Sequence, residues 1–299
     1  MTAWRRLPLA VASAVAVSLS AGAAWAQQPA PAAALTAAEL PKLIKLKDDV
    51  YVIQNANSVV SEIGRFGGNV TVVLTPEGVV LVDSKNPSMH DDIVQKVRSL
   101  TDKPIKYVIL THNHADHSGG AAKMKAIGAT LIISEADREN MARTDVPGLP
   151  DIAYSGHAAL FVGGKAFRLA EHRGHTRGDT TVYIPGSRVL VAGDLVTTPD
   201  SIPEIVNYGD GGNWTDLVKT LNQLARLDFD ILVGGHGPVL TKAQFLTFKD
   251  KVAAIGERFR ALNREKKSAE EIGQTLMREF NWGTGPAAGV IPGMMQELR

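Results

Sequence analysis

The chain has 299 residues, a formal net charge of +1 at pH 7 and no cysteine. This length is enough for one large globular domain with a sizeable core and a small appendage. The balanced charge argues against nucleic acid as a partner. Without cysteine, disulfides and thiolate metal ligands are excluded, so any metal must be held by histidine and carboxylate side chains.

The first 26 residues have the pattern of a secretory signal peptide. Two arginines precede an apolar, alanine-rich run over residues 7–24, and residues 24–26 (Ala-Trp-Ala) match the small-x-small cleavage pattern. An uncleaved membrane anchor is the alternative, but the many alanines make the run only mildly hydrophobic. We therefore expect cleavage after Ala26, a periplasmic or secreted protein, and no membrane contact after cleavage.

Residues 27–44 are predicted to be a flexible linker, because the first part of this segment is rich in alanine, proline and glutamine. The main folded domain is expected over residues 45–244. Its first elements are predicted to be a strand at 50–53 and a hairpin of two strands, 69–74 and 78–82, with a loop at 61–68.

A helix is predicted to open at Ser88, with Asp91 at capping-box spacing. His90 in its first turn is expected at the surface. The elements predicted further along are strands at 130–133, 167–169, 182–184, 189–192 and 230–233, helices at 135–141 and 214–227, and an irregular stretch at 143–157.

The segment after the apolar run 105–110 is the most informative of the chain. It places His112, His114, Asp116 and His117 within six positions, just before a predicted helix over 121–127 with Ser118 near its cap. Side chains two residues apart in an extended segment share a face, so the first three can converge. Three imidazoles and one carboxylate so close together favour zinc or a similar cation over a solvated polar loop.

This cluster resembles the His-x-His-x-Asp-His signature of the metallo-β-lactamase-fold superfamily of hydrolases. Three further ligand-type residues follow in the order of that family, each beside glycine: His175, Asp194 and His236. The resemblance extends from about residue 50 to residue 239. It implies an α/β fold, a four-layer αββα sandwich with a metal centre at one end of its sheets.

The same resemblance implies roles for these residues. One metal would be held by His112, His114 and His175. The other would be held by Asp116, His117 and His236. Asp194 would bridge the two, and Asp116 would also orient the attacking water. The implied cofactors are two Zn²⁺ ions, with iron or manganese also compatible with nitrogen and oxygen ligands.

Two aspartates are candidates for supporting roles. Asp83 closes the strand 78–82 and resembles the family's acid that orients a metal-binding histidine through its free ring nitrogen; a turn-forming aspartate is the alternative. Asp179 is expected to pin the His175 loop through backbone hydrogen bonds. His172 competes with His175 as a ligand, but only His175 has the flanking glycine and threonine of the family motif, so His172 is expected at the pocket edge.

Residues 245–299 are predicted to form C-terminal helices. Large apolar residues recur from Phe245 to Leu262 at three- and four-residue steps, which indicates one amphipathic helix. This repeat covers too few heptads for a coiled coil, so we expect the helix to pack on the domain. Ser268 and Glu271 have the capping-box spacing that opens a second helix.

The resemblance implies an exported dinuclear zinc hydrolase acting on an ester, lactone, thioester or amide of a small molecule. Family β-lactamases usually carry cysteine or serine at the position of Asp194, so its aspartate is more similar to glyoxalase II-like thioesterases and lactonases. The alternatives are a periplasmic β-lactamase, a phosphodiesterase, and a metal-binding accessory protein without turnover.

Overall fold

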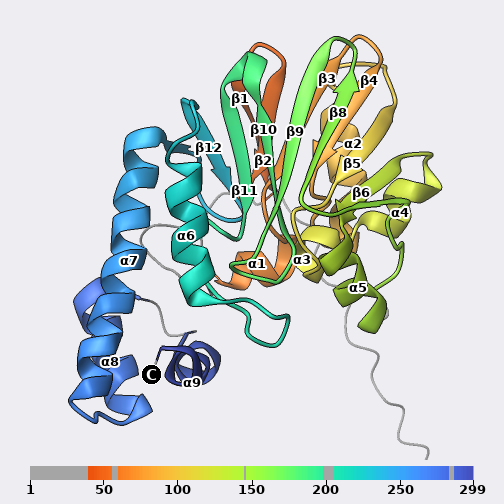
Figure 1. The fold of residues 1–299 in the computed structure, drawn as a ribbon. Coiled ribbons are helices and arrows are strands. Elements are labelled where there is room, and N and C mark those ends of the chain that lie inside the picture. Colours follow the sequence, from red (N-terminus) through yellow and green to blue (C-terminus); the bar gives the residue numbers. More distant parts are fainter. Residues whose placement is uncertain (1–39, 56–59, 145, 198–204, 283–285, 299) are drawn as a thin grey trace, which may run out of the picture. The chain divides into compact units, whose positions relative to one another are not determined.

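The computed structural model describes residues 40–55, 60–144, 146–197, 205–282 and 286–298. The predicted signal peptide and most of the predicted linker lie outside these residues. Two β-sheets pack face to face, and helices cover both outer faces (Figure 1). This is the predicted αββα sandwich. Within the described ranges, no helix has both the length and the apolar character needed to cross a membrane.

The first sheet has seven strands in sequence order. They are β1 (Lys42–Lys47), β2 (Val50–Gln54), β3 (Val70–Thr75), β4 (Gly78–Val82), β5 (Ile105–Ile109), β6 (Thr130–Ser134) and β7 (Ile152–Tyr154). Strands β1 to β4 pair antiparallel, and β4 to β7 pair parallel. The parallel strands β4, β5 and β6 therefore all end at the same edge of the sheet.

The second sheet has six strands in the order β13-β12-β11-β10-β9-β8. They are β8 (His157–Val162), β9 (Lys165–His172), β10 (Asp179–Ile184), β11 (Val189–Gly193), β12 (Ile231–Gly234) and β13 (Leu240–Thr241). All neighbours are antiparallel except β11 and β12, where Gly193 pairs with Gly234. The residues that follow these two glycines consequently leave the sheet side by side.

The pleat of the strands explains how each sheet contributes to two cores. In β11, Val189 and Val191 face the first sheet, whereas Leu190 and Ala192 face the helices on the other side. A strand buried on both faces has a continuous apolar sequence rather than an alternating one. All five residues of β11 are buried.

Helices α4 (Ala121–Ala126) and α5 (Glu135–Arg143) cover the first sheet together with α2 (His90–Arg98) (Figure 1). Helices α6 (Trp214–Leu224) and α7 (Lys242–Arg264) cover the second sheet. Asn213 caps α6, because its side chain accepts a hydrogen bond from the Asp216 N–H.

The C-terminal segment packs on the same core. The apolar stripe of α7, from Phe245 to Leu262, is buried with residues of α6 and of the second sheet. Helix α8 (Ala269–Phe280) opens with the predicted capping box of Ser268 and Glu271. It is followed by α9 (Pro286–Glu297), a helix that the sequence pattern did not reveal.

Several local predictions were wrong. The expected loop at 61–68 is largely helix α1 (Val60–Phe66), and the irregular stretch after residue 143 contains β7. Strand β1 begins at Lys42, inside the segment expected to be linker. A 3-10 turn (Pro87–Met89) precedes α2, so Ser88 caps nothing. His90 is buried beneath the helix rather than exposed.

Candidate metal centre

The predicted ligand residues lie at one end of both sheets, on the connections that leave the strands. The segment after β5 carries His112 and His114 and then enters the short helix α3 (Ala115–Ser118), which carries two more. Ser118 belongs to this helix and does not cap the next one; its hydroxyl donates to the Asn113 carbonyl oxygen. Thus one short connection supplies four of the seven predicted ligand residues.

The other three ligand-type residues come from the second sheet. His175 lies in the connection of the β9–β10 hairpin, where His172 and Asp179 close the pairing. Asp194 directly follows β11, and His236 follows β12 with one residue, Gly235, in between. Because β11 and β12 are parallel and in register at their last glycines, these two side chains reach the same point.

The first group of ligand-type side chains consists of three imidazoles, those of His112, His114 and His175. His175 Nε2 lies 3.1 Å from His114 Nδ1. The His112 ring lies against the rings of His114 and His175, with its Nε2 buried and without a hydrogen-bond partner among the side chains that the structure describes. An imidazole nitrogen in this condition is available as a metal ligand.

The second group consists of Asp116, His117 and His236. The two histidine Nε2 atoms are 3.2 Å apart. Asp116 Oδ2 lies 3.2 Å from His236 Nε2 and 3.5 Å from His117 Nε2. Three potential ligand atoms therefore surround one point.

Asp194 lies between the two groups. Its carboxylate oxygens are 3.3 Å from His117 Nε2, 3.3 Å from His236 Nε2 and 3.7 Å from His175 Nε2. Gly235 makes this position possible, because a Cβ atom there would lie 1.8 Å from Asp194 Oδ1. The backbone can pass this close to the carboxylate only without a side chain.

These separations suit a metal. Zinc bound to nitrogen at about 2.0–2.1 Å in a tetrahedral site places neighbouring ligand atoms roughly 3.3 Å apart. The closest pairs within the first and second groups are 3.1 Å and 3.2 Å apart. The seven side chains are therefore spaced as metal ligands are, and Asp194 lies beside both groups.

Charge differs between the two groups. In the first, burial lowers the pKa of His175 to about 4, against the opposing effect of Asp194. Burial and the neighbouring His117 and His114 likewise hold the pKa of His112 well below its usual value. Both imidazoles are consequently neutral, the form that binds metal.

In the second group the carboxylates dominate. Burial alone would lower the pKa of His236, but Asp194 and Asp116 raise it to about 9. The same carboxylates and Asp83 raise the pKa of His117 well above its usual value despite its burial. Burial opposes ionisation of Asp116, yet His117 and His236 bring its pKa down to about 2. Without metal, this group is a network of ion pairs.

The two aspartates that the sequence offers for supporting roles contact the loops of the two groups. Asp83 Oδ2 lies 2.9 Å from His117 Nδ1 and accepts a hydrogen bond from the Thr111 hydroxyl at 2.8 Å. The Asp179 carboxylate accepts from the N–H of Thr176 at 3.0 Å, directly beside His175. Asp83 thus holds the His117 ring so that its Nε2 faces the other ligand atoms of the second group. Asp179 fixes the loop that carries His175 of the first group.

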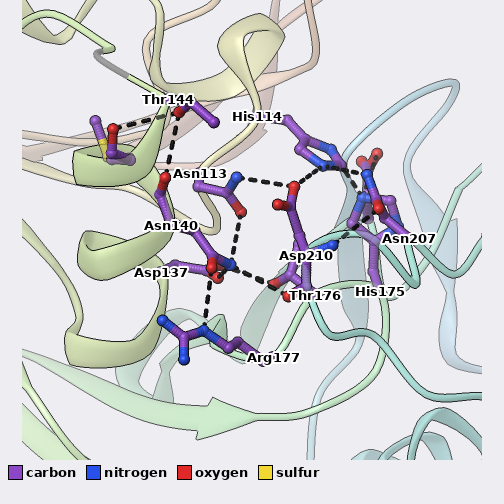
Figure 2. A network of polar contacts seen from close by, with 12 residues as sticks. Asn113, His114, Asp137, Asn140, Thr144, His175, Thr176, Arg177, Asn207 and Asp210 are labelled. Carbon is purple, nitrogen blue, oxygen red and sulfur yellow. Dashed lines mark hydrogen bonds and ion pairs between the residues drawn. The ribbon is translucent and has the colours of Figure 1, made fainter.

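The sequence did not reveal the residues that hold His114. Its Nε2 lies 3.0 Å from Asp210 Oδ2 and 2.9 Å from Asn207 Nδ2 (Figure 2). Asp210 also accepts from Asn113 Nδ2 at 3.0 Å. Figure 2 shows how this network continues through Asn140 to Arg177. Residues 207–212 have only the composition of a turn, so no local signal distinguishes them.

The remaining histidines near the motif lie elsewhere. His172 is on β9, where its Nε2 is 2.9 Å from the Thr181 hydroxyl and burial lowers its pKa to about 4. With His157 it lines a separate 260 Å³ cavity against α6. It therefore does not border the metal centre, contrary to the expectation for the pocket edge.

An αββα sandwich that carries a group of three histidines, a group of two histidines and an aspartate, and Asp194 beside both at the end of its sheets defines a metal-dependent hydrolase. The family model described as the metallo-beta-lactamase superfamily matches residues 63–236, and the chain belongs to this superfamily.

Known proteins agree with this assignment. The chain is 28% identical over 214 residues to a metallo-beta-lactamase type 2 of Bacillus cereus, covering 66% of this chain and 81% of the relative. It is 25% identical over 199 residues to a metallo-beta-lactamase type 2 of Elizabethkingia meningoseptica, covering 65% and 78%. The solved metallo-beta-lactamase from Pontibacter korlensis has the same fold, with a TM-score of 0.63 and 20% identity over 71% of this chain and 99% of that one.

Proposed function

We propose that the chain is an exported dinuclear zinc hydrolase that cleaves an ester, lactone, thioester or amide bond of a small molecule. The observation that carries this proposal is the position of Asp194 between the two groups of ligand-type side chains. A carboxylate there offsets the repulsion between two cations, which neutral imidazoles cannot do. One zinc ion would be held by His112, His114 and His175, and the other by Asp116, His117 and His236.

Two bound cations would supply Lewis acidity that activates water and polarises the acyl carbonyl group. The chain's own contribution to the reaction is the arrangement of charge. Asp116 has the side chain that is most open to solvent in the centre, at 24% exposure, and its low pKa keeps it ionised. Its carboxylate can accept a hydrogen bond from an incoming water and orient it toward the substrate. His114, at 20% exposure, is the next most exposed of the seven predicted ligands.

A β-lactamase is the second candidate, because the curated relatives carry that name. Their identity to this chain is low, and the resemblance places cysteine or serine in most such enzymes where this chain has Asp194. A carboxylate at this point gives the second metal an anionic ligand of a harder type. We therefore favour the ester, lactone and thioester class.

The test is a hydrolysis screen of the purified, zinc-loaded protein against lactones, thioesters, β-lactams and phosphodiesters, with metal content measured in parallel. We expect close to two zinc ions per chain, turnover of a lactone or thioester, and loss of turnover on chelation. At most one metal after saturation would exclude the dinuclear centre. Efficient β-lactam hydrolysis that survives Asp194→Ser would favour the lactamase instead.

Export is tested separately. The full-length chain should be processed to a mature protein that begins at Gln27, and this product should be found outside the cytoplasm. Mass spectrometry of fractionated cells would measure both properties. An intact N-terminus in a cytoplasmic fraction would contradict the export part of the proposal and leave the hydrolase part unaffected.

A further inference from the structure

The last helix of the chain ends in a carboxylate that binds another helix. Glu297 accepts hydrogen bonds from the N–H of Trp214 at 2.8 Å and from the N–H of Thr215 at 2.7 Å, which are the first two residues of α6. The Thr215 hydroxyl also donates to it. A carboxylate at the start of a helix satisfies free N–H groups and interacts favourably with the helix dipole.

The same carboxylate reaches the connection that precedes α6. The Tyr208 hydroxyl donates to Glu297 Oε2 at 2.9 Å. The ring of Tyr208 also packs on α9 at Gly293, where an added Cβ would lie 2.1 Å from the ring. Helix α9 therefore holds Tyr208 at two points, its hydroxyl group and its ring.

Tyr208 lies in a connection, residues 205–213, whose opposite side contacts the first ligand group. Asn207 and Asp210 lie 2.9 and 3.0 Å from His114 Nε2. The Asn207 N–H donates to the carbonyl oxygen of His175 at 2.8 Å. This connection thus contacts the imidazole of His114 and the backbone of His175, which are two of the three histidines of the first group.

We propose that Glu297 is a positioning residue for the first metal, acting through residues 205–213 on His114 and His175. This inference rests on the proposed function, because it assumes that these two histidines bind metal. Helix α6 has its own cap at Asn213. Loss of the Glu297 carboxylate should therefore release Tyr208 and the connection while α6 remains folded. The second ligand group, which Asp83 orients, should respond less.

The test compares Glu297→Gln and Glu297→Ala with Glu279→Gln. Glu279 pairs with Arg258 at 2.8 Å across α7 and α8, so this control removes a charge from the same C-terminal helices without contact to residues 205–213. The two stepwise zinc affinities are measured by competition with a chromophoric chelator. The step that disappears in His175→Ala identifies the first site. Thermal unfolding of each protein is recorded alongside.

We expect Glu297→Ala to weaken the first site about tenfold, and Glu297→Gln somewhat less, at the lower end of the range for residues behind a metal ligand. The second site and the control should stay within about twofold of wild type. The absorption spectrum of cobalt in the first site should also change. If Glu297→Ala does not fold, Tyr208→Phe removes one of the same hydrogen bonds and keeps the ring.

Lower melting temperatures with both zinc affinities and the cobalt spectrum unchanged would overturn the proposal, since Glu297 would then only stabilise the fold. Equal weakening of both sites would also overturn it. Failure of the wild-type protein to bind two ions would overturn the dinuclear centre itself, and this inference with it. If the wild type binds two ions but substitution of Glu297 changes neither zinc affinity, this inference alone would be overturned.

Discussion

The two ligand groups of the metal centre use similar side chains in opposite electrostatic surroundings. In the first, burial keeps the pKa of His175 near 4. In the second, Asp194 and Asp116 overcome burial and raise the pKa of His236 to about 9. The balance between desolvation and nearby carboxylates, rather than the residue type, decides whether a histidine is neutral before metal arrives.

The two groups also differ in what holds them. The second is oriented by Asp83, which directly follows β4 of the same sheet that carries His117. The first is held by Asp210 and Asn207, almost a hundred residues away along the chain from His114. In the second group, His117 is therefore supported by a residue of its own sheet, whereas His114 in the first group depends on a distant connection and, as proposed, on the C-terminal helix.

The largest effect on the two groups is expected when the negative charge of Asp194, which lies between them, is removed. Asp194→Asn keeps the size of the side chain but cannot offset two cations. We expect the zinc content to fall from two ions toward one and turnover to fall by about 100-fold or more, with only partial recovery in excess zinc. Elemental analysis and initial rates measure these effects. Unchanged metal content would show that Asp194 does not bridge.

A matched pair of variants tests whether the two groups are held independently. Asp83→Asn should weaken the second zinc site by about 10–100-fold, and Asp210→Asn should weaken the first by a similar factor. Each variant should leave the other site within a few-fold of wild type. Stepwise zinc affinities distinguish the two outcomes. Loss of both sites in either variant would show that the groups are coupled rather than separate.

The sequence predicted the ligand-type residues and two supporting aspartates, Asp83 and Asp179, but not the residues that hold His114, for a physical reason. His112, His114, Asp116 and His117 are adjacent along the chain, so their convergence follows from local strand geometry. Asp210 reaches His114 only because the second sheet folds against the first. A turn-forming aspartate and a histidine-binding aspartate have the same local sequence, and tertiary contacts alone distinguish them.

The same limit explains the errors in secondary structure. The strands buried on both faces and the amphipathic helix α7 carry strong periodic patterns, and both were predicted. Helix α1 is short, contains Gly64, and ends where Gly67 adopts a φ of 85°. Helix α9 contains Pro292, which disfavours a helix in the sequence. In both cases tertiary packing outweighs local propensity.

The contrast in pKa predicts a third difference, in proton release. Binding of zinc to the second group must displace the protons that the raised pKa values of His117 and His236 retain. At pH 7 we expect release of about one to two protons from this group and close to none from His112 and His175. Calorimetric titration of zinc in buffers of different ionisation enthalpy measures the number. Asp83→Asn should reduce the release; equal release at both steps would contradict the contrast.

The smallest expected effect concerns Lys85, which supports the backbone next to the second group. Its side chain is fully buried, and Nζ donates to Asn55 Oδ1 at 2.7 Å and to the Gly68 carbonyl oxygen at 2.5 Å. Gly68 packs so closely on His117 that an added Cβ would lie 2.2 Å from the ring. Burial lowers the pKa of Lys85 to about 7, with a smaller opposing effect of Asp92.

This pKa gives the stability a definite pH dependence. Between about pH 7 and pH 10.5 the unfolded chain keeps the Lys85 proton while the folded chain loses it, so the unfolded state binds more protons and stability rises with pH. Relative to Lys85→Met, the free energy of unfolding of the wild type should therefore increase by roughly 1 kcal/mol per pH unit across the lower part of this window. Denaturant unfolding at equal metal loading measures the difference. Lys106→Met, which removes an exposed lysine paired with Glu77, serves as the control and should run parallel to wild type. A Lys85→Met curve that also runs parallel would show that Lys85 keeps its proton in the folded protein, and that its ammonium group holds the Gly68 backbone as a permanent charge.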